Sequence, residues 1–181
     1  NKEDVEEMNT KMVLFVYLYR RNNHKEIKMA IAQAVCNTFK QEMLEGKHNF
    51  AATSSDTFKI ALFTSSASLG ATTTDYSTSN ETTNTSGTAY VAGGQTLAGQ
   101  SVTGGSSAAI AYVDWSTNPQ WTSASFTANG AMIYNTTTGS GTGTTDAVCI
   151  LAFGADFTAS NGTFTITFPA ADTTNAILRL S

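Results

Sequence analysis

Apolar side chains recur at every fourth position in the segment that follows Met29. The stripe consists of Ile31, Val35, Phe39 and Met43, and Ala32, Cys36 and Leu44 broaden it. This spacing is typical of one face of an amphipathic helix, so we predict a helix over about residues 30–45. Gly46 follows at the position where a left-handed C-terminal cap is expected. The stripe would either dock on a partner protein or cover an open sheet edge of the chain's own domain.

The hydrophobic period changes from 3.6 to 2 after Phe50, and short apolar runs then alternate with polar turns. We expect strands at 57–64, 89–91, 95–97, 108–115, 124–127, 131–134, 147–153, 162–168 and 176–180. Residues 65–87 are rich in Ser, Thr and Asn and are expected to form a long loop or an irregular edge. Gly93 and Gly94 indicate a hairpin turn or a bulge.

These elements together predict a mainly β fold. We expect an antiparallel β-sandwich, immunoglobulin-like or jelly-roll-like, preceded by one N-terminal amphipathic helix. Helix-length periods do not occur between the expected strands, which argues against a parallel α/β sheet.

The first 28 residues differ from the rest of the chain. Residues 12–19 (MVLFVYLY) are apolar but shorter than the roughly 20 residues that span a bilayer. Residues 25–29 (KEIKM) can be encoded by a purine-rich stretch resembling a bacterial ribosome-binding site before a start codon. We therefore predict that Met29 is the true start, with a genuine helical arm as the alternative. The expected organisation is an extension at 1–28, the helix and a linker at 29–50, and the sandwich at 51–181.

Charge is sparse, with 13% charged residues and a net charge of -4. Phosphate binding needs clustered Lys and Arg, and residues 29–181 hold only Lys40, Lys47, Lys59 and Arg179, so nucleic acid is not expected as a partner. A membrane partner is not expected either, because the apolar run at 12–19 is too short.

Few residues suit catalysis or metal binding. Cys36 and Cys149 are expected to be small core residues, and His48 a residue beside the helix end. The glycine cluster at 138–144 lacks the Lys of a phosphate-binding loop and is expected to be a flexible hairpin tip. The carboxylates are scattered over separate expected turns, and the sequence contains no calcium-loop motif. We therefore predict a protein that is not an enzyme and has no catalytic residues, no cofactor and no metal site.

Trp115 and Trp121 bracket the polar segment 116–120. Two tryptophans beside such a loop could stack against the rings of a host glycan. They could equally be core anchors at a strand end, which is the commoner role of large aromatic side chains.

Several segments resemble, in order, a widespread family of small tailed-phage virion proteins. They are residues 39–50, 56–64, 76–81, 87–90, 92–97, 130–135, 153–156, 164–169 and 176–180. Members of that family typically begin where Met29 stands. Asn129 departs from the pattern, because relatives often carry Arg there, and residues 100–109 do not match it.

The resemblance implies a structural component of the phage particle, made in the cytoplasm of a bacterial host and located in the virion. We expect a capsid decoration or cement protein that binds the major capsid protein or other virion proteins. A homo-oligomer is expected, and a trimer would suit the three-fold positions of a head lattice. The alternatives are a tail-associated protein or a receptor-recognition module that binds a host surface glycan, and a depolymerase ranks third.

Overall fold

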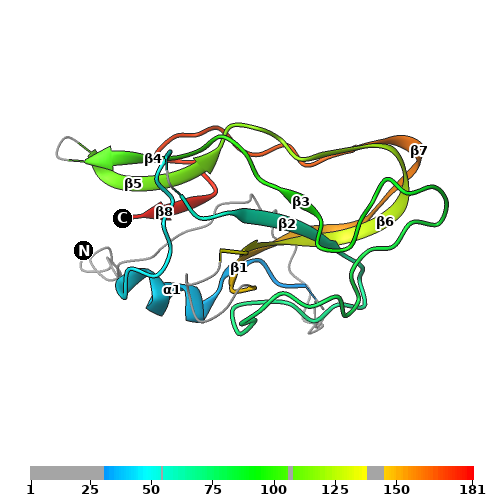
Figure 1. Cartoon of the computed structure of the whole chain (residues 1–181), viewed down its shortest axis with the longest axis horizontal. Coiled ribbons are helices and arrows are strands. Elements are labelled where there is room, and N and C mark those ends of the chain that lie inside the picture. The colour runs from blue at the N-terminus through cyan, green and yellow to red at the C-terminus, as the bar shows by residue number, and fades with distance from the viewer. Residues whose placement is uncertain (1–30, 54, 106–107, 138–144) are drawn as a thin grey trace, which may run out of the picture.

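The computed structural model describes residues 31–53, 55–105, 108–137 and 145–181, which form a mainly β fold with one short helix (Figure 1). The elements are β1 (Ala34–Val35), α1 (Asn37–Leu44), β2 (Phe58–Phe63), β3 (Gln95–Thr96), β4 (Gln100–Gly105), β5 (Ala108–Trp115), β6 (Gln120–Asn135), β7 (Ala147–Thr165) and β8 (Leu178–Leu180). All strand pairs between these elements are antiparallel. The predicted mainly β class is therefore confirmed.

The strands form two sheets. One has five strands in the order β1-β7-β6-β2-β3, and the other has three in the order β4-β5-β8. The long hairpin β6–β7 runs from the pair Gln120 and Thr165 to the pair Tyr134 and Ala147. Both of its strands bend over together at one end of the molecule, away from α1 (Figure 1). The hairpin therefore continues well beyond the part of the sheet that β1 and β2 cover.

An aromatic cluster joins the two sheets. The ring of Phe58 on β2 stacks on Phe50 at 4.4 Å and lies 5.7 Å from Trp115 on β5, measured between centroids. All three side chains are buried. Burying a large aromatic side chain contributes roughly 1.5–3 kcal/mol relative to leaving it exposed, so this cluster is a main source of the stability of the fold.

The predicted helix is shorter than expected and begins later. Residues 31–36 are extended: β1 pairs with β7, Ala32 donates its backbone N–H to Leu69, and Cys36 donates to Val148. A spacing of four also places two residues on one face of an extended chain, because four is a multiple of the strand period. Ile31 and Val35 therefore fitted the helical pattern equally well. The expected left-handed cap is confirmed at Gly46, whose φ is +70°.

Some expected strands are joined or paired differently. The runs at 124–127 and 131–134 are one strand, β6, and those at 147–153 and 162–168 lie largely in β7. β4 was not predicted, because its sequence QSVTGG has one large apolar residue. The turn at Gly93 and Gly94 is confirmed, but the strand after it, β3, pairs with β2 rather than with residues 89–91. The hairpin tip at 138–144 and the extension at 1–28 lie outside the described residues.

A buried carboxylate joins three parts of the long polar segment 65–94 to one another, beside the sheet. Glu81 accepts hydrogen bonds from the hydroxyls of Tyr76 and Tyr90, both at 2.6 Å, and from the backbone N–H of Gly93 at 2.7 Å. Tyr134 on β6 donates to the carbonyl of Gly93 at 2.7 Å. The segment contains only isolated bridges among its described residues. These side-chain bonds hold it in place together with backbone bonds such as those from the N–H groups of Thr82 to Leu62 and of Thr85 to Ser125.

A second buried network holds α1 on the sheet. The Nε2 atom of His48 lies 2.8 Å from Glu42 of α1, and its Nδ1 atom lies 2.9 Å from the side-chain nitrogen of Asn135 at the end of β6. The same nitrogen donates to Asp56 at 2.8 Å, and the amide oxygen of Asn135 accepts from Thr137. Because the amide must point its NH₂ group at Asp56, Nδ1 of His48 acts as acceptor and Nε2–H donates to Glu42.

Replacing Glu81 tests whether this carboxylate holds the segment. Glu81→Ala leaves two hydroxyls and one N–H without their acceptor, so we expect the free energy of unfolding to fall by roughly 2–5 kcal/mol. Glu81→Gln keeps one acceptor oxygen and should lose less. Urea unfolding measures both variants. The exposed Glu45→Gln is the control, expected to stay within about 0.5 kcal/mol of wild type, and an equally small effect at Glu81 would contradict the assignment.

The same cluster predicts how stability depends on alkaline pH. Burial raises the pKa of Tyr76 and Tyr90, and the nearby Glu81 carboxylate raises it further. Burial also raises the pKa of Tyr134, to about 12. The folded state therefore holds these protons more tightly than the unfolded chain does. The stabilisation is complete below the ordinary tyrosine pKa of roughly 10 and is lost as pH rises through the folded-state values. Urea unfolding followed with tyrosinate absorbance should show this loss, and a flat profile would contradict it.

Candidate functional site

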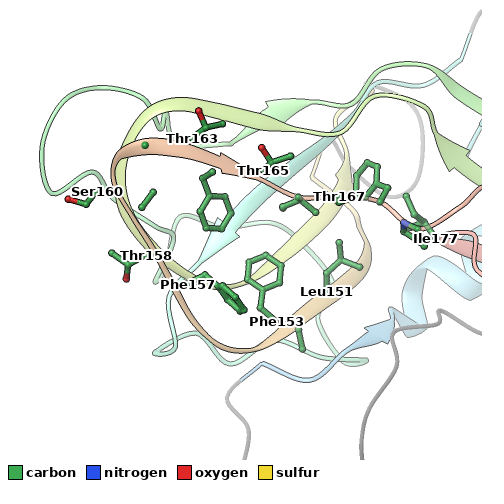
Figure 2. A pocket seen from close by; sticks show the side chains of 16 residues that line it. Leu151, Phe153, Phe157, Thr158, Ser160, Thr163, Thr165, Thr167 and Ile177 are labelled. Carbon is green, nitrogen blue, oxygen red and sulfur yellow. The ribbon is translucent and has the colours of Figure 1, made fainter.

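The concave side of β7 forms an apolar groove of about 680 Å³, which we call the β7 groove. Leu151, Phe153 and Phe157 lie on one limb of the curve, and Thr163 and Thr165 lie on the returning limb (Figure 2). The rings of Phe153 and Phe164 meet across it with centroids 6.4 Å apart. Further lining residues include Ile166, Phe168, Pro169 and Ile177. The described residues that line the groove are all uncharged, so its contacts would be made through apolar surface and hydroxyl groups.

An irregularity in the pairing of β6 with β7 shapes the groove. Ala128 pairs with Phe157, and Gly130 pairs with Ala152, so the four residues 153–156 lie opposite Asn129 alone. Gly154 has a φ of +79°, which favours glycine. The side-chain nitrogen of Asn129 donates to Asp156 at 2.7 Å. This bulge turns the limb that carries Phe153 and Phe157, and its residues 153–156 are one of the segments behind the phage-family resemblance.

The two long edges of the β6–β7 hairpin differ in whether another described segment of the chain pairs with them. Beyond β2, the edge of β6 is covered by the chain itself: Thr85 donates its backbone N–H to the carbonyl of Ser125, and the Thr82 hydroxyl donates to Thr127. On β7, β1 pairs only with Cys149 and Ile150. Among the described residues no strand covers the outer edge of β7 from Leu151 to Thr165. An uncovered edge is a template for pairing with another chain.

The expected docking stripe is not a surface. Ile31, Val35 and Phe39 are buried in the core, and Met43 packs against the core while partly exposed. Ile31 lies over Gly130, where an added Cβ would come within 2.8 Å of its side chain. Of the two alternatives, the structure supports the one in which the stripe covers the chain's own sheet, since β1 lies on the edge of β7.

The expected sugar-stacking platform is not present at the surface either. Trp115 is 1% exposed and Trp121 is 2% exposed. Trp115 packs against Phe58 and Phe168, and Trp121 packs against Phe126 and Phe164. Neither ring is available to a glycan, so both tryptophans fit the core interpretation.

The remaining candidate residues are also internal. Both thiols are buried and free, and burial raises the pKa of Cys36 to about 12 and that of Cys149 well above its ordinary value. His48 follows the end of α1, as expected, and lies in the buried network with Glu42. Asp114 is buried with one carboxylate oxygen that accepts no hydrogen bond, and burial raises its pKa. Within the described ranges, no group of three His, Cys, Asp or Glu side chains could hold a metal ion.

The β7 groove was missed at the level of sequence. Its residues were predicted as parts of two separate strands, because Gly154, Gly162 and the polar residues between them interrupt the apolar pattern. The alternation of Phe164, Ile166 and Phe168 was visible, but not that Phe164 faces Phe153. That contact depends on the bend of the hairpin.

Comparison with known proteins gave no match to a family model, a curated protein or a solved structure. No helix among the described residues is long and apolar enough to cross a membrane.

The bond between Asn129 and Asp156 should contribute measurably although Asp156 is exposed and Asn129 is only half-buried. Asn129→Ala should lower the free energy of unfolding by up to about 1 kcal/mol. Asn129→Arg should restore stability by an ion pair with Asp156.

A double-mutant cycle with Asp156→Ala, measured by urea unfolding, tests this pair. The restoring effect of the Asn129→Arg substitution should disappear when Asp156 is absent. Equal stability of the Asn129→Ala and Asn129→Arg variants would contradict the role given to the bond.

Proposed function

We propose that this chain is a structural protein of a phage virion, acting as a decoration or cement protein that binds the head lattice. The observation that carries the proposal is the β7 groove beside a β7 edge that no described strand covers, because an uncharged apolar groove next to such an edge suits contact with another protein. The proposed role needs no catalysis.

The segments that resemble the phage family support this role, because they form the buried networks of the fold and line the β7 groove. Tyr76, Glu81, Tyr90 and Gly93 meet in the tyrosine–carboxylate cluster. His48 and Asn135 meet in the network under α1. Residues 153–156 and 164–169 surround the β7 groove. The resembling residues thus build a stable scaffold and one apolar surface, which is what a passive component of a particle requires.

We also infer that the two sheets form a β-sandwich. The contact of Phe58 on β2 with Trp115 on β5 supports face-to-face packing, and so does the burial of side chains from both sheets in one core. The turned hairpin β6–β7 would then join the layers at one end. Whether the connectivity is closer to an immunoglobulin or to a jelly roll stays a prediction.

The second candidate, a tail-associated protein, uses the same surface on a different partner. The glycan-binding alternative loses its main support, since Trp115 and Trp121 are buried. A decoration role on the head therefore remains the first proposal.

Purified particles of the phage that encodes this chain test the proposal by copy number. Quantitative mass spectrometry should find the chain at a large, fixed ratio to the major capsid protein, because a decoration protein repeats with the lattice. Heads separated from tails should retain it. Particles without the chain would contradict a virion role, and a few copies that travel with the tails would contradict the head placement.

A further inference from the structure

Asparagine is followed by glycine twice in the sequence, at Asn129–Gly130 and at Asn161–Gly162. Asparagine is a thermolabile residue. A following glycine leaves the asparagine side chain open to attack by the next backbone nitrogen, because glycine has no Cβ to shield that nitrogen. The two sites share this local sequence but differ in their surroundings. Those surroundings therefore decide which of the two asparagines reacts.

Asn161 is the extra residue of a bulge in β7. Ala124 of β6 pairs with Gly162, and Ser125 pairs with Ser160. Asn161 lies between these two pairs and has no partner in the ladder. Its φ is +49°, in the left-handed region. Its backbone N–H donates to the hydroxyl of Ser125 at 2.9 Å, whereas its side-chain amide makes no hydrogen bond with another described residue. Asn161 and Gly162 are both exposed, so water reaches the amide carbon, Cγ, of Asn161.

The space around Gly162 lets the backbone turn there. A Cβ added at Gly162 would meet nothing closer than the carbonyl oxygen of Ser160, at 4.0 Å. Ser160 and Gly162 line the β7 groove where the strand turns back (Figure 2). Asn161 lines a second cavity of about 440 Å³, together with Thr122 and Ser123. Because this segment lies between two hollows, rotation about the backbone of Asn161 can bring the nitrogen of Gly162 to Cγ.

Asn129 and Gly130 are held in place by their neighbours. The side-chain nitrogen of Asn129 donates to Asp156 at 2.7 Å. Gly130 is buried in the middle of the five-stranded sheet, where it pairs with Phe63 of β2 on one side and with Ala152 of β7 on the other. The nitrogen of Gly130 therefore cannot turn toward the side chain of Asn129 without breaking the sheet.

We propose that Asn161 is a site of spontaneous deamidation and that the fold protects Asn129 from the same reaction. The backbone nitrogen of Gly162 loses its proton to water or hydroxide and forms a bond to Cγ of Asn161. The bond from Cγ to the side-chain nitrogen breaks, and that nitrogen leaves as ammonia. Water then opens the cyclic imide at either of its carbonyl groups, which gives aspartate or isoaspartate at position 161. The reaction involves no oxidation or reduction, and water is its co-reactant.

The product carries a negative charge that Asn161 lacks. Ser160 and Gly162, on either side of it, line the β7 groove, whose described lining residues are all uncharged. Deamidation therefore places a carboxylate beside an uncharged groove. Isoaspartate also lengthens the main chain by one carbon atom, at a residue that is already outside the ladder. An aged copy of the chain thus presents a different surface from a fresh copy. The site stands on its own geometry and does not depend on the virion role.

Incubation of the folded chain at mildly alkaline pH, followed by mass spectrometry, tests the site. Chymotrypsin cleaves after aromatic residues, so digestion separates the peptide that contains Asn161 from the one that contains Asn129. Incubation in water enriched in heavy oxygen labels every carboxylate that forms during the experiment. We expect the Asn161 peptide to accumulate labelled aspartate and isoaspartate over days, while the Asn129 peptide stays unmodified. The rate should rise with pH, because the attacking nitrogen must lose its proton.

Two variants and the unfolded chain serve as controls. Gly162→Ala should fold, because open space receives the added methyl group, and should slow the reaction severalfold, because the methyl group shields the nitrogen. Asn161→Gln should remove the reaction at this position, because the longer side chain closes a larger ring much more slowly. Far-UV circular dichroism and the melting temperature verify that both variants fold. In urea, Asn161 and Asn129 should react at similar rates, because the surroundings that distinguish them are lost.

Three results would each overturn the proposal. The Asn161 peptide could stay unmodified in the folded chain. Asn129 could react as fast as Asn161 in the folded chain, which would show that the fold does not select between them. The Gly162→Ala variant could react at the wild-type rate, which would show that the nitrogen of Gly162 is not the attacking group.

Discussion

The constraint that matters most is the outer edge of β7 from Leu151 to Thr165, which no strand among the described residues covers. β6 and β7 form one hairpin long enough to pass beyond the sheet and turn over, and β1 covers β7 only at Cys149 and Ile150. The chain covers the other side of the hairpin with its own segment 82–85. An exposed strand edge beside an apolar groove is a template for pairing with another chain, and natural proteins usually protect such edges. The proposed virion partner would complete the sheet along this edge.

Two buried polar networks fix the elements that pack against β6. The Glu81 carboxylate collects two tyrosine hydroxyls and a backbone N–H, which fixes the segment along β6. His48, with Glu42 and Asn135, fixes α1 against the end of the same strand. Satisfied networks of this kind specify one arrangement of the elements they join. Groups that resemble catalytic residues, a histidine between a carboxylate and an amide, are here occupied in holding the scaffold together.

Local patterns predicted the class of the fold and many of its strands, because alternation in segments such as 57–64 depends only on which face is buried. They also predicted the cap at Gly46. The predicted start of the helix was wrong because the spacing of Ile31 and Val35 fits both a helix and a strand. Pairing with the edge of β7, more than 100 residues away in sequence, decides in favour of the strand. The sequence also did not decide whether Trp115 and Trp121 lie in the core or at the surface, because that too depends on contacts with residues far away in sequence. The groove could not be predicted at all, since Phe153 and Phe164 meet only after the hairpin bends.

Hydrogen–deuterium exchange, compared between the isolated chain and its assembled form, tests the central claim most directly. If the edge of β7 is open in the single chain and covered by another chain in the particle, amides between Leu151 and Thr165 that point away from β6 should exchange quickly in the isolated chain. They should become protected in the particle, while amides buried in β2 stay protected in both. Equal protection of the β7 amides in both states would show that the edge is never used and would contradict this account.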